Sequence, residues 1–268
     1  MSGNVPALVR WLVRAKVIPK AAVAQLDGVE APEPQAVLDA GRLAEQTYDL
    51  LDQLGQDVVL IARMGQNLAQ FKLTYSHLGF AYKGDSGEWQ VLHLLNKEDA
   101  STSGIFEEGI ANFYSDNLFR FEACVLTLPR ALQKTLLEAI KTHRKTLHCA
   151  YYSLTSHPDS LGTQNSNQWV LEVLASGLAQ MTAPTRMLVQ QWLRENGYVC
   201  STLKIPLATQ WAGPLLRDSI RFGDQPDADR RQELIRTITV DSVVDWLQGE
   251  ASPLGPGRAE CRLHKLSL

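Results

Sequence analysis

The stretch LTYSHLGFAYKGDSGEWQVLHLL, residues 73–95, consists of two segments rich in aromatic and aliphatic residues on either side of a short polar turn. The turn, GDSG at residues 84–87, contains glycines, which adopt the positive φ angles of tight hairpin turns without steric cost. Segments of this composition bounded by turn residues are typical of β-strands. The stretch therefore predicts an antiparallel β-hairpin with strands over 73–83 and 88–95.

Further strands and helices are expected on both sides of this hairpin. Short β-rich runs bounded by Gly, Asp or Pro predict strands at residues 58–64, 121–128 and 198–205. Apolar residues at helical spacing predict helices at residues 39–55, 130–145, 167–180, 185–196 and 241–248, the last capped by Asp241 or Ser242. Because most strands cluster between helices instead of alternating with them, the expected fold class is α+β, an antiparallel sheet packed with helices.

The two ends of the chain differ in composition from the part between them. Residues 5–18, VPALVRWLVRAKVI, predict an amphipathic helix, and GVEAPEPQ at 28–35 has the composition of a linker. The segment from residue 252 onward has little apolar order and is expected to be loose. We therefore expect an N-terminal helical extension and linker at 1–36, one α+β domain at 37–249 and a C-terminal tail at 250–268.

Composition narrows the class of protein. With 45% hydrophobic and 21% charged residues the chain is typical of a globular protein, and its net charge of −3 argues against a nucleic-acid binder, which needs a basic face. Its four cysteines share no CxxC spacing, and no cofactor is predicted. The N-terminal apolar run is interrupted by charges and is too short for a membrane span, so as written the chain is expected to be cytoplasmic; a periplasmic or secreted location is the alternative if a signal was trimmed.

Two histidines fall within the predicted hairpin and are candidates for chemistry. Strict alternation along YSHLGFAY puts Tyr75, His77 and Gly79 on one face of the strand, and a glycine there allows a close approach. His93, on the partner strand, is then a cross-strand neighbour of His77. The alternative is that both are half-buried histidines bonded to backbone. A metal site is not predicted, because no third ligand stands at a recognisable spacing.

A polar cluster before the helix at 167–180 provides a candidate nucleophile. In TQNSNQW, residues 163–169, the three side chains Asn165, Ser166 and Asn167 all suit a helix cap. A nucleophile at this position would lie at the positive end of the helix dipole, near unpaired N–H groups that stabilise an anion. A serine hydroxyl also needs a base to take its proton, and His77 is the natural candidate. Ser166 is therefore either part of a cap or a nucleophile.

The strand YSHLGFAYK followed by WQVLHLLN resembles the strand pair of circularly permuted papain-like hydrolases of the NlpC type, in which a histidine strand precedes the nucleophile-bearing helix. Residues from about 37 to 249 are also similar to a bacterial family, domain of unknown function 2145. The stretches that carry this second resemblance are VVLIARMGQNL, YSHLGFAYK, VLHLLN, QNSNQWVLEVLA, RFGDQPDADR and TVDSVVDWL.

The resemblance implies a role for each candidate residue. The base histidine of the superfamily falls on His77, its polar orienting residue on His93, and its nucleophilic cysteine on Ser166, which departs from the pattern. The serine is then an engineered substitution, a natural nucleophile, or a natural residue in a protein that has lost hydrolysis. The resemblance also implies export for many members of the family.

Two functions from different classes follow. The first is an amidase or peptidase-type hydrolase acting by acyl transfer on a small-molecule, peptide or acyl substrate, with Ser166, His77 and His93 as catalytic residues. Asn165, Asn167, Tyr75 and Trp169 are then expected to bind substrate. The second is a non-catalytic ligand- or protein-binding module on the same fold, in which Tyr75, Trp89 and Trp169 offer apolar contacts. A partner-binding role for the N-terminal helices is a third possibility.

The catalytic hypothesis predicts a definite geometry. Ser166 Oγ should lie within about 4 Å of a His77 ring nitrogen, and His93 should bond the other nitrogen.

Overall fold

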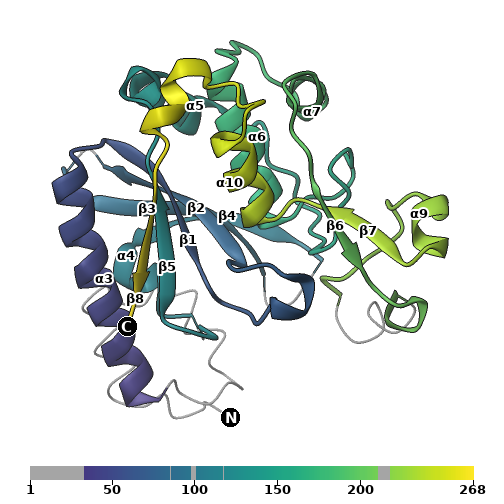
Figure 1. Cartoon of the computed structure of the whole chain (residues 1–268), viewed down its shortest axis with the longest axis horizontal. Coiled ribbons are helices and arrows are strands. Elements are labelled where there is room, and N and C mark those ends of the chain that lie inside the picture. Colours follow the sequence, from purple (N-terminus) through teal and green to yellow (C-terminus); the bar gives the residue numbers. More distant parts are fainter. Residues whose placement is uncertain (1–32, 85, 98–100, 117, 211–217) are drawn as a thin grey trace.

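A six-stranded antiparallel sheet forms the centre of the molecule (Figure 1). The computed structural model describes residues 33–84, 86–97, 101–116, 118–210 and 218–268. The strands lie in the order β4-β3-β2-β1-β5-β8. Their bounds are β1 Val58–Arg63, β2 His77–Lys83, β3 Trp89–Asn96, β4 Ser103–Gly109, β5 Glu122–Leu126 and β8 Leu263–Ser267. With helices packed against the sheet, the chain has the predicted α+β fold class.

The predicted hairpin is confirmed, and its strands β2 and β3 lie side by side with Phe80 opposite Leu92. The first strand, however, begins at His77 and not at residue 73. The segment before it is bound elsewhere, because the Thr74 N–H donates to the Asp241 carboxylate at 3.2 Å. Strand alternation therefore does not extend back to Tyr75. The prediction that Tyr75 shares a face with His77 was wrong, and Tyr75 packs in the core cluster that contains Phe80.

Both edges of the sheet are strands that the sequence did not predict. β4 pairs with β3 along its whole length, from Asn96 opposite Ser103 to Gln90 opposite Gly109. At the other edge, β8 pairs with β5, with Ala123 opposite Leu266. The expectation that the segment from residue 252 onward is loose was therefore wrong. The unpaired backbone of β5 provides the template, so this tail forms a short 3-10 helix, Gly255–Glu260, and then a strand.

Helices cover both faces of the sheet and create two apolar cores. On one face α3 (Pro34–Leu54) and α4 (Ile110–Phe113) pack against alternate residues of β1, including Val59 and Ile61. On the other face α5 (Gln133–His143), α6 (Ser166–Leu178) and α10 (Val240–Gln248) share one core with Val58 and Leu60. The helix α7 (Arg186–Glu195) packs against the outside of α6. Successive side chains of a strand point to opposite faces of the sheet, so each strand contributes residues to both cores.

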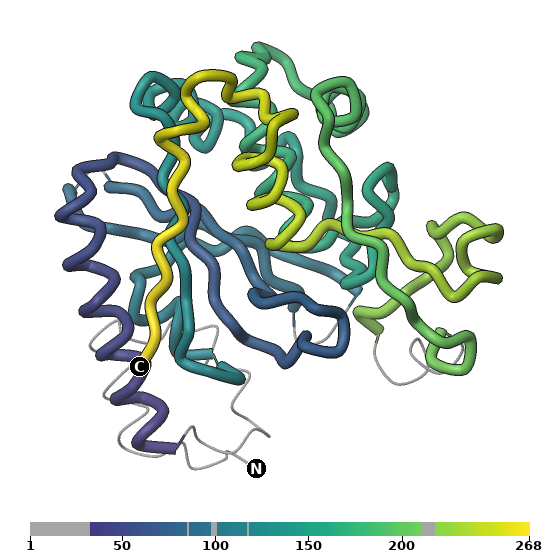
Figure 2. The backbone as a smooth tube through the Cα atoms, in the orientation of Figure 1, coloured from purple at the N-terminus to yellow at the C-terminus, as the bar shows by residue number. Residues whose placement is uncertain are grey.

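A small second sheet projects from the main body, at the right of Figures 1 and 2. It consists of β6 (Ser201–Lys204) and β7 (Leu234–Thr237), with the short helix α9 (Asp227–Arg231) before β7. Ile205, Phe222 and Ile235 form its own small apolar cluster, against which Phe71 from the β1–β2 connection also packs. We call this unit the β6–β7 arm. Phe71 ties the arm to the connection that leads into β2.

Details at the helix ends differ from the predictions. The predicted linker at 28–35 ends earlier than expected, because α3 already begins at Pro34, a residue suited to the first helical turn. The cap of α10 is Thr239, whose hydroxyl accepts from Ser242 N, so neither predicted cap residue is the N-cap. The helix predicted at 5–18 lies outside the described residues. In the described part of the chain, no helix has both the length and the apolarity to span a membrane.

Candidate functional site

The helix α6 begins at Ser166, and its cap is Asn165. The Asn165 side chain accepts a hydrogen bond from Gln168 N at 2.7 Å, and the Gln168 side chain reaches back to Asn165 N, which completes a capping box. Asn165 also donates to Thr237 Oγ1 at 2.9 Å at the end of the β6–β7 arm. Because Asn165 alone satisfies the cap, the Ser166 hydroxyl is not needed there and makes a different contact.

The Ser166 hydroxyl begins a chain of polar contacts that crosses the sheet strand by strand. Ser166 Oγ lies 3.2 Å from His77 Nδ1 on β2, and His77 Nε2 lies 2.8 Å from His93 Nδ1 on β3. His93 Nε2 lies 3.0 Å from a carboxylate oxygen of Glu108 on β4, close enough for an ion pair but not aligned as a hydrogen bond. These contacts match the geometry predicted for the first three residues. All four side chains are buried from solvent, with His93 fully buried.

One arrangement of protons suits this chain when Glu108 is ionised and both histidines are neutral. The negative carboxylate beside His93 Nε2 favours the proton on that nitrogen, so His93 presents Nδ1 as an acceptor. His77 must then carry its proton on Nε2 and donate to His93, which leaves His77 Nδ1 as an acceptor for the Ser166 hydroxyl. The array therefore holds His77 in the tautomer that a general base needs.

Glu108 is the site residue that the sequence reasoning missed. The signal lay in SGIFEEG, where strand alternation puts Glu108 on the same face as Phe106 and apart from Glu107. A carboxylate on a partly apolar face is unusual unless it has a buried partner. Glu107 faces outward and pairs with Arg144 at 2.6 Å. The strand was not predicted, so the inward-facing carboxylate was not recognised.

The absence of a side chain at Gly79 allows β2 and β3 to approach closely beside the two histidines. By the register of β2 and β3 this glycine lies next to His93, and a Cβ atom added to Gly79 would lie 3.3 Å from His93 Cβ and 3.2 Å from Leu92 O. The close approach expected at this glycine is therefore made by the neighbouring strand. The absent side chain leaves the space through which the His93 ring reaches His77.

An aromatic ring and a buried cation enclose the base. The Phe113 ring lies 5.8 Å from the His77 ring and 5.3 Å from the His93 ring, centroid to centroid. The Arg63 guanidinium lies 4.7 Å from the Phe113 centroid and pairs with Asp116 at 2.6 Å. Burial, the positive charge of Arg63 and the neighbouring His93 together lower the pKa of His77 well below its usual value of 6.5. His77 is therefore neutral at pH 7 and able to accept a proton.

The Asn167 side chain joins the start of α6 to the start of β2. Its side-chain oxygen accepts from Leu78 N at 3.0 Å, and its amide group donates to Ser76 O at 3.4 Å. These backbone groups lie on either side of His77 in the chain. The side chain predicted to bind substrate is thus bound to the strand that carries the base. Asn167 fixes the start of α6, and with it Ser166, against His77.

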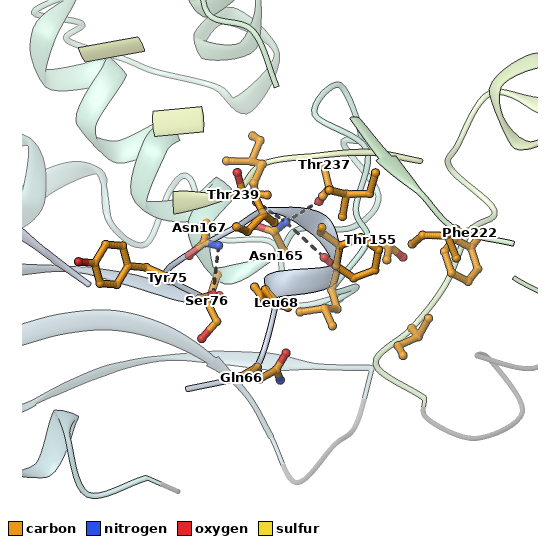
Figure 3. Close-up of a pocket in the computed structure, with 18 of the residues that line it drawn as sticks. Gln66, Leu68, Tyr75, Ser76, Thr155, Asn165, Asn167, Phe222, Thr237 and Thr239 are labelled. Carbon is orange, nitrogen blue, oxygen red and sulfur yellow. Dashed lines mark hydrogen bonds between the residues drawn. The ribbon is translucent and has the colours of Figure 1, made fainter. Parts of the chain in front are cut away.

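A cavity with a volume of about 230 Å³ opens beside Ser166 (Figure 3). Ser166, Asn165, Asn167 and Tyr75 are among the residues that line it, and Figure 3 shows the Asn167 side chain pointing to Ser76 on the cavity wall. Trp169 is not part of this wall. It is fully buried in the core, where its indole N–H donates to Arg144 O at 3.0 Å.

Trp89 also lies away from the cavity. It packs in the core beneath α3, and its indole N–H donates to Asp52 at 3.3 Å. Of the aromatic residues predicted to contact a ligand, the structure therefore brings Tyr75 alone to the cavity.

Two other serine–histidine contacts in the described residues lack these features. Ser176 Oγ lies 3.0 Å from His143 Nδ1, but Ser176 also donates to Val173 O inside α6 and is fully buried. Ser103 Oγ lies 3.0 Å from His148 Nε2. Neither serine lines the cavity beside Ser166. Serine and histidine proximity is therefore common in this fold, and the array behind His77 together with the adjoining cavity distinguishes Ser166.

Comparison with known proteins identifies a family to which most of the chain matches. Residues 50–247 match a family described as an uncharacterized protein conserved in bacteria (DUF2145). No curated protein and no solved structure matches the chain. Among the residues that the structure describes, no group of three or more His, Cys, Asp or Glu side chains is placed to hold a metal ion.

Proposed function

The chain belongs to the DUF2145 family, which is described as uncharacterized, and we therefore propose its function from the geometry of its site: a serine-type hydrolase that acts by acyl transfer. The observation that supports the proposal most is the continuous array from Ser166 through His77 and His93 to Glu108. Such an array combines a nucleophile, a base and a group that orients the base. It also fits the order expected of a circularly permuted papain-like hydrolase, with the base on an early strand and the nucleophile on a later helix.

The proposed reaction begins with attack of Ser166 Oγ on the carbonyl carbon of the substrate, while His77 Nδ1 takes the hydroxyl proton. Positive charge then develops on His77, and the Nε2–H of that ring donates to His93, which in turn faces the Glu108 carboxylate. The negative charge on the carbonyl oxygen is stabilised by the N–H groups of Ser166 and Asn167, since the first turn of a helix has no internal partners for them.

The second half of the reaction returns the enzyme to its starting state. The tetrahedral intermediate collapses when His77 gives its proton to the leaving amine or alcohol, and the acyl group remains on Ser166. A water molecule then attacks this acyl group, with His77 again accepting the proton. Breakdown of the second intermediate releases the acid and restores the Ser166 hydroxyl. Each step moves one proton through His77 and needs no other reagent.

A fluorophosphonate probe, which phosphonylates activated serines, tests the proposal. We expect one adduct, located at Ser166 by peptide mass spectrometry and lost in Ser166→Ala. Since a general base contributes about 10²–10⁴-fold, His77→Gln should slow the labelling by at least about a hundredfold. Glu108→Gln should slow it less, because this residue acts through His93.

His143→Gln is the matched control, since His143 contacts a serine that does not line the cavity. This variant should label at the wild-type rate. Absence of any adduct, or equal labelling of the wild type and His77→Gln, would rule out an activated serine. The site would then belong to a binding module. Ser166→Cys with a thiol-reactive probe gives an independent measure, because a competent site should activate the thiol and the His77→Ala background should suppress its reaction.

A further inference from the structure

The cavity beside Ser166 carries no charged side chain in its described lining. Its wall is built mainly from apolar residues of three places: the β1–β2 connection, the β6–β7 arm and the loop before α6. They include Leu68, Phe71, Leu73, Leu154, Leu203, Ile205, Ile220, Phe222 and Ile238. A wall of this kind has no ion-pair partner for a charged ligand, and it gains free energy by removing apolar surface of a ligand from water.

Most polar side chains in the wall already have partners within the protein. Thr155 donates to Arg221 O at 2.7 Å, and the Thr237 hydroxyl accepts from Asn165. Thr239 caps α10, and Ser76 Oγ accepts from Gly65 N at 2.9 Å. With Asn165 and Asn167 bound as described above, the buried wall offers few hydrogen-bonding groups to a ligand. A polar peptide or a sugar entering this space would lose its hydrogen bonds to water without replacing them.

We infer that the cavity holds a straight aliphatic acyl chain, whose carbonyl carbon lies at Ser166. This inference rests on the proposed function, since it names the acyl group that Ser166 would accept. The position of Ser166 in the wall places the reacting end of the chain at the start of α6, and the apolar residues of the β6–β7 arm surround the remainder.

The size of the cavity sets the length of chain that fits. A dry protein cavity of about 150 Å³ binds benzene, with its six carbon atoms. Scaled to the volume of about 230 Å³ found here, the cavity accommodates roughly nine carbon atoms. The ligand is therefore a chain of medium length, and longer chains extend past the mouth, where Gln66 and Thr209 are exposed.

Binding of uncharged alkyl amides to the full-length Ser166→Ala protein tests the inference without any reaction. Calorimetric titrations with butanamide, hexanamide, octanamide, decanamide and dodecanamide should show affinity rising about fourfold for each added methylene, as expected for complete burial. The gain should level off once the chain exceeds roughly nine carbon atoms. Tetra-alanine, a short peptide of small side chains, should bind more weakly than octanamide.

Substitutions in the arm provide the control. Leu203→Gln puts an amide group on the cavity wall and should weaken octanamide binding by at least about fivefold. Val199→Gln, the same kind of change just before the same strand, alters a side chain that is 75% exposed and lies outside the cavity, so binding should be unchanged. Leu203→Trp should fill part of the cavity and shorten the longest chain that still gains affinity. Thermal unfolding of each variant shows whether it is folded.

The outcomes separate this inference from the proposed function. Length-dependent binding together with fluorophosphonate labelling supports both, and hydrolysis of an octanoyl 4-nitrophenyl ester against the matching 4-nitroanilide then shows whether the acyl group comes from an ester or an amide. Length-dependent binding without labelling supports the acyl cavity and refutes the hydrolase. Labelling with no dependence of affinity on chain length, or tighter binding of tetra-alanine than of octanamide, overturns the acyl cavity and leaves the hydrolase standing.

Discussion

Replacing Gly79 with alanine tests whether the site depends on the close approach of β2 and β3. A Cβ atom at this position would lie 3.0 Å from Val91 Cγ1, 3.2 Å from Leu92 O and 3.3 Å from His93 Cβ. All three distances are shorter than the separation of about 3.5–4.0 Å that carbon contacts prefer, and the Leu92 oxygen belongs to backbone that cannot rotate away. The strands must therefore move apart by a few tenths of an ångström. Crowding of this kind costs about 1–3 kcal/mol in the free energy of unfolding.

The same movement should weaken the base, because it displaces His93 from its 2.8 Å contact with His77. Loss of one such hydrogen bond, about 1 kcal/mol, would slow fluorophosphonate labelling of Ser166 roughly fivefold. Stability is measured by urea denaturation and the site by the labelling rate. Gly109→Ala is the control, since a Cβ there meets nothing within 4 Å, and it should change stability by less than about 0.5 kcal/mol. A Gly79→Ala protein as stable as the control and labelled at the wild-type rate would refute the argument.

Four further predictions concern the base, its surroundings and the helix α3. Asn167→Ala should lower the free energy of unfolding in urea by about 1–3 kcal/mol, because the Leu78 N–H loses its acceptor, whereas Asn167→Asp, which keeps the acceptor, should lose less. Arg63→Met should raise the pKa of His77, measured by NMR of the imidazole, because it removes a positive charge; an unchanged or lower pKa would contradict the assignment. Since the folded chain binds this proton less readily than the unfolded chain, the wild type should lose stability as pH falls below 6.5, and His77→Gln should lose less. Gly41→Ala, in open space on α3, should raise stability by about 0.5–1 kcal/mol, and urea denaturation will show whether it does.

Patterns in short stretches of sequence predicted the elements whose formation depends on residues next to one another in the chain. The hairpin of β2 and β3 carries its own turn, and α6 carries its own cap, so both were found from short stretches of sequence. The two edge strands were missed for the opposite reason. β4 contains Glu107 and Glu108, and three of the five residues of β8 are polar, so neither is strongly apolar. Their pairing is decided by the strand beside them, which the sequence of each segment does not contain.

The residues of the candidate site also fall into those that the sequence predicted and those that it did not. Ser166, His77 and His93 were found from residue type, position and resemblance, and the structure brings their side chains together. The roles expected for Asn167 and Trp169 depended on where their side chains point, which a single sequence does not specify. Asn167 is bound to the backbone around His77, and Trp169 is turned into the core. Glu108 required knowledge of which strand pairs with β3.

The pairing of β8 with β5 has a consequence for how the chain is made. Val125 of β5 pairs with His264, so the sheet edge at β5 is completed by residues that follow it much later in the sequence. During translation, which proceeds at about 5–20 residues per second, β1 to β5 leave the ribosome well before their last partner. Throughout that interval the apolar edge of β5 is open to pairing with another nascent chain. The sheet therefore stays incomplete until β8 has been synthesised, and a ribosome stalled between β5 and β8 would hold a chain whose sheet is still open.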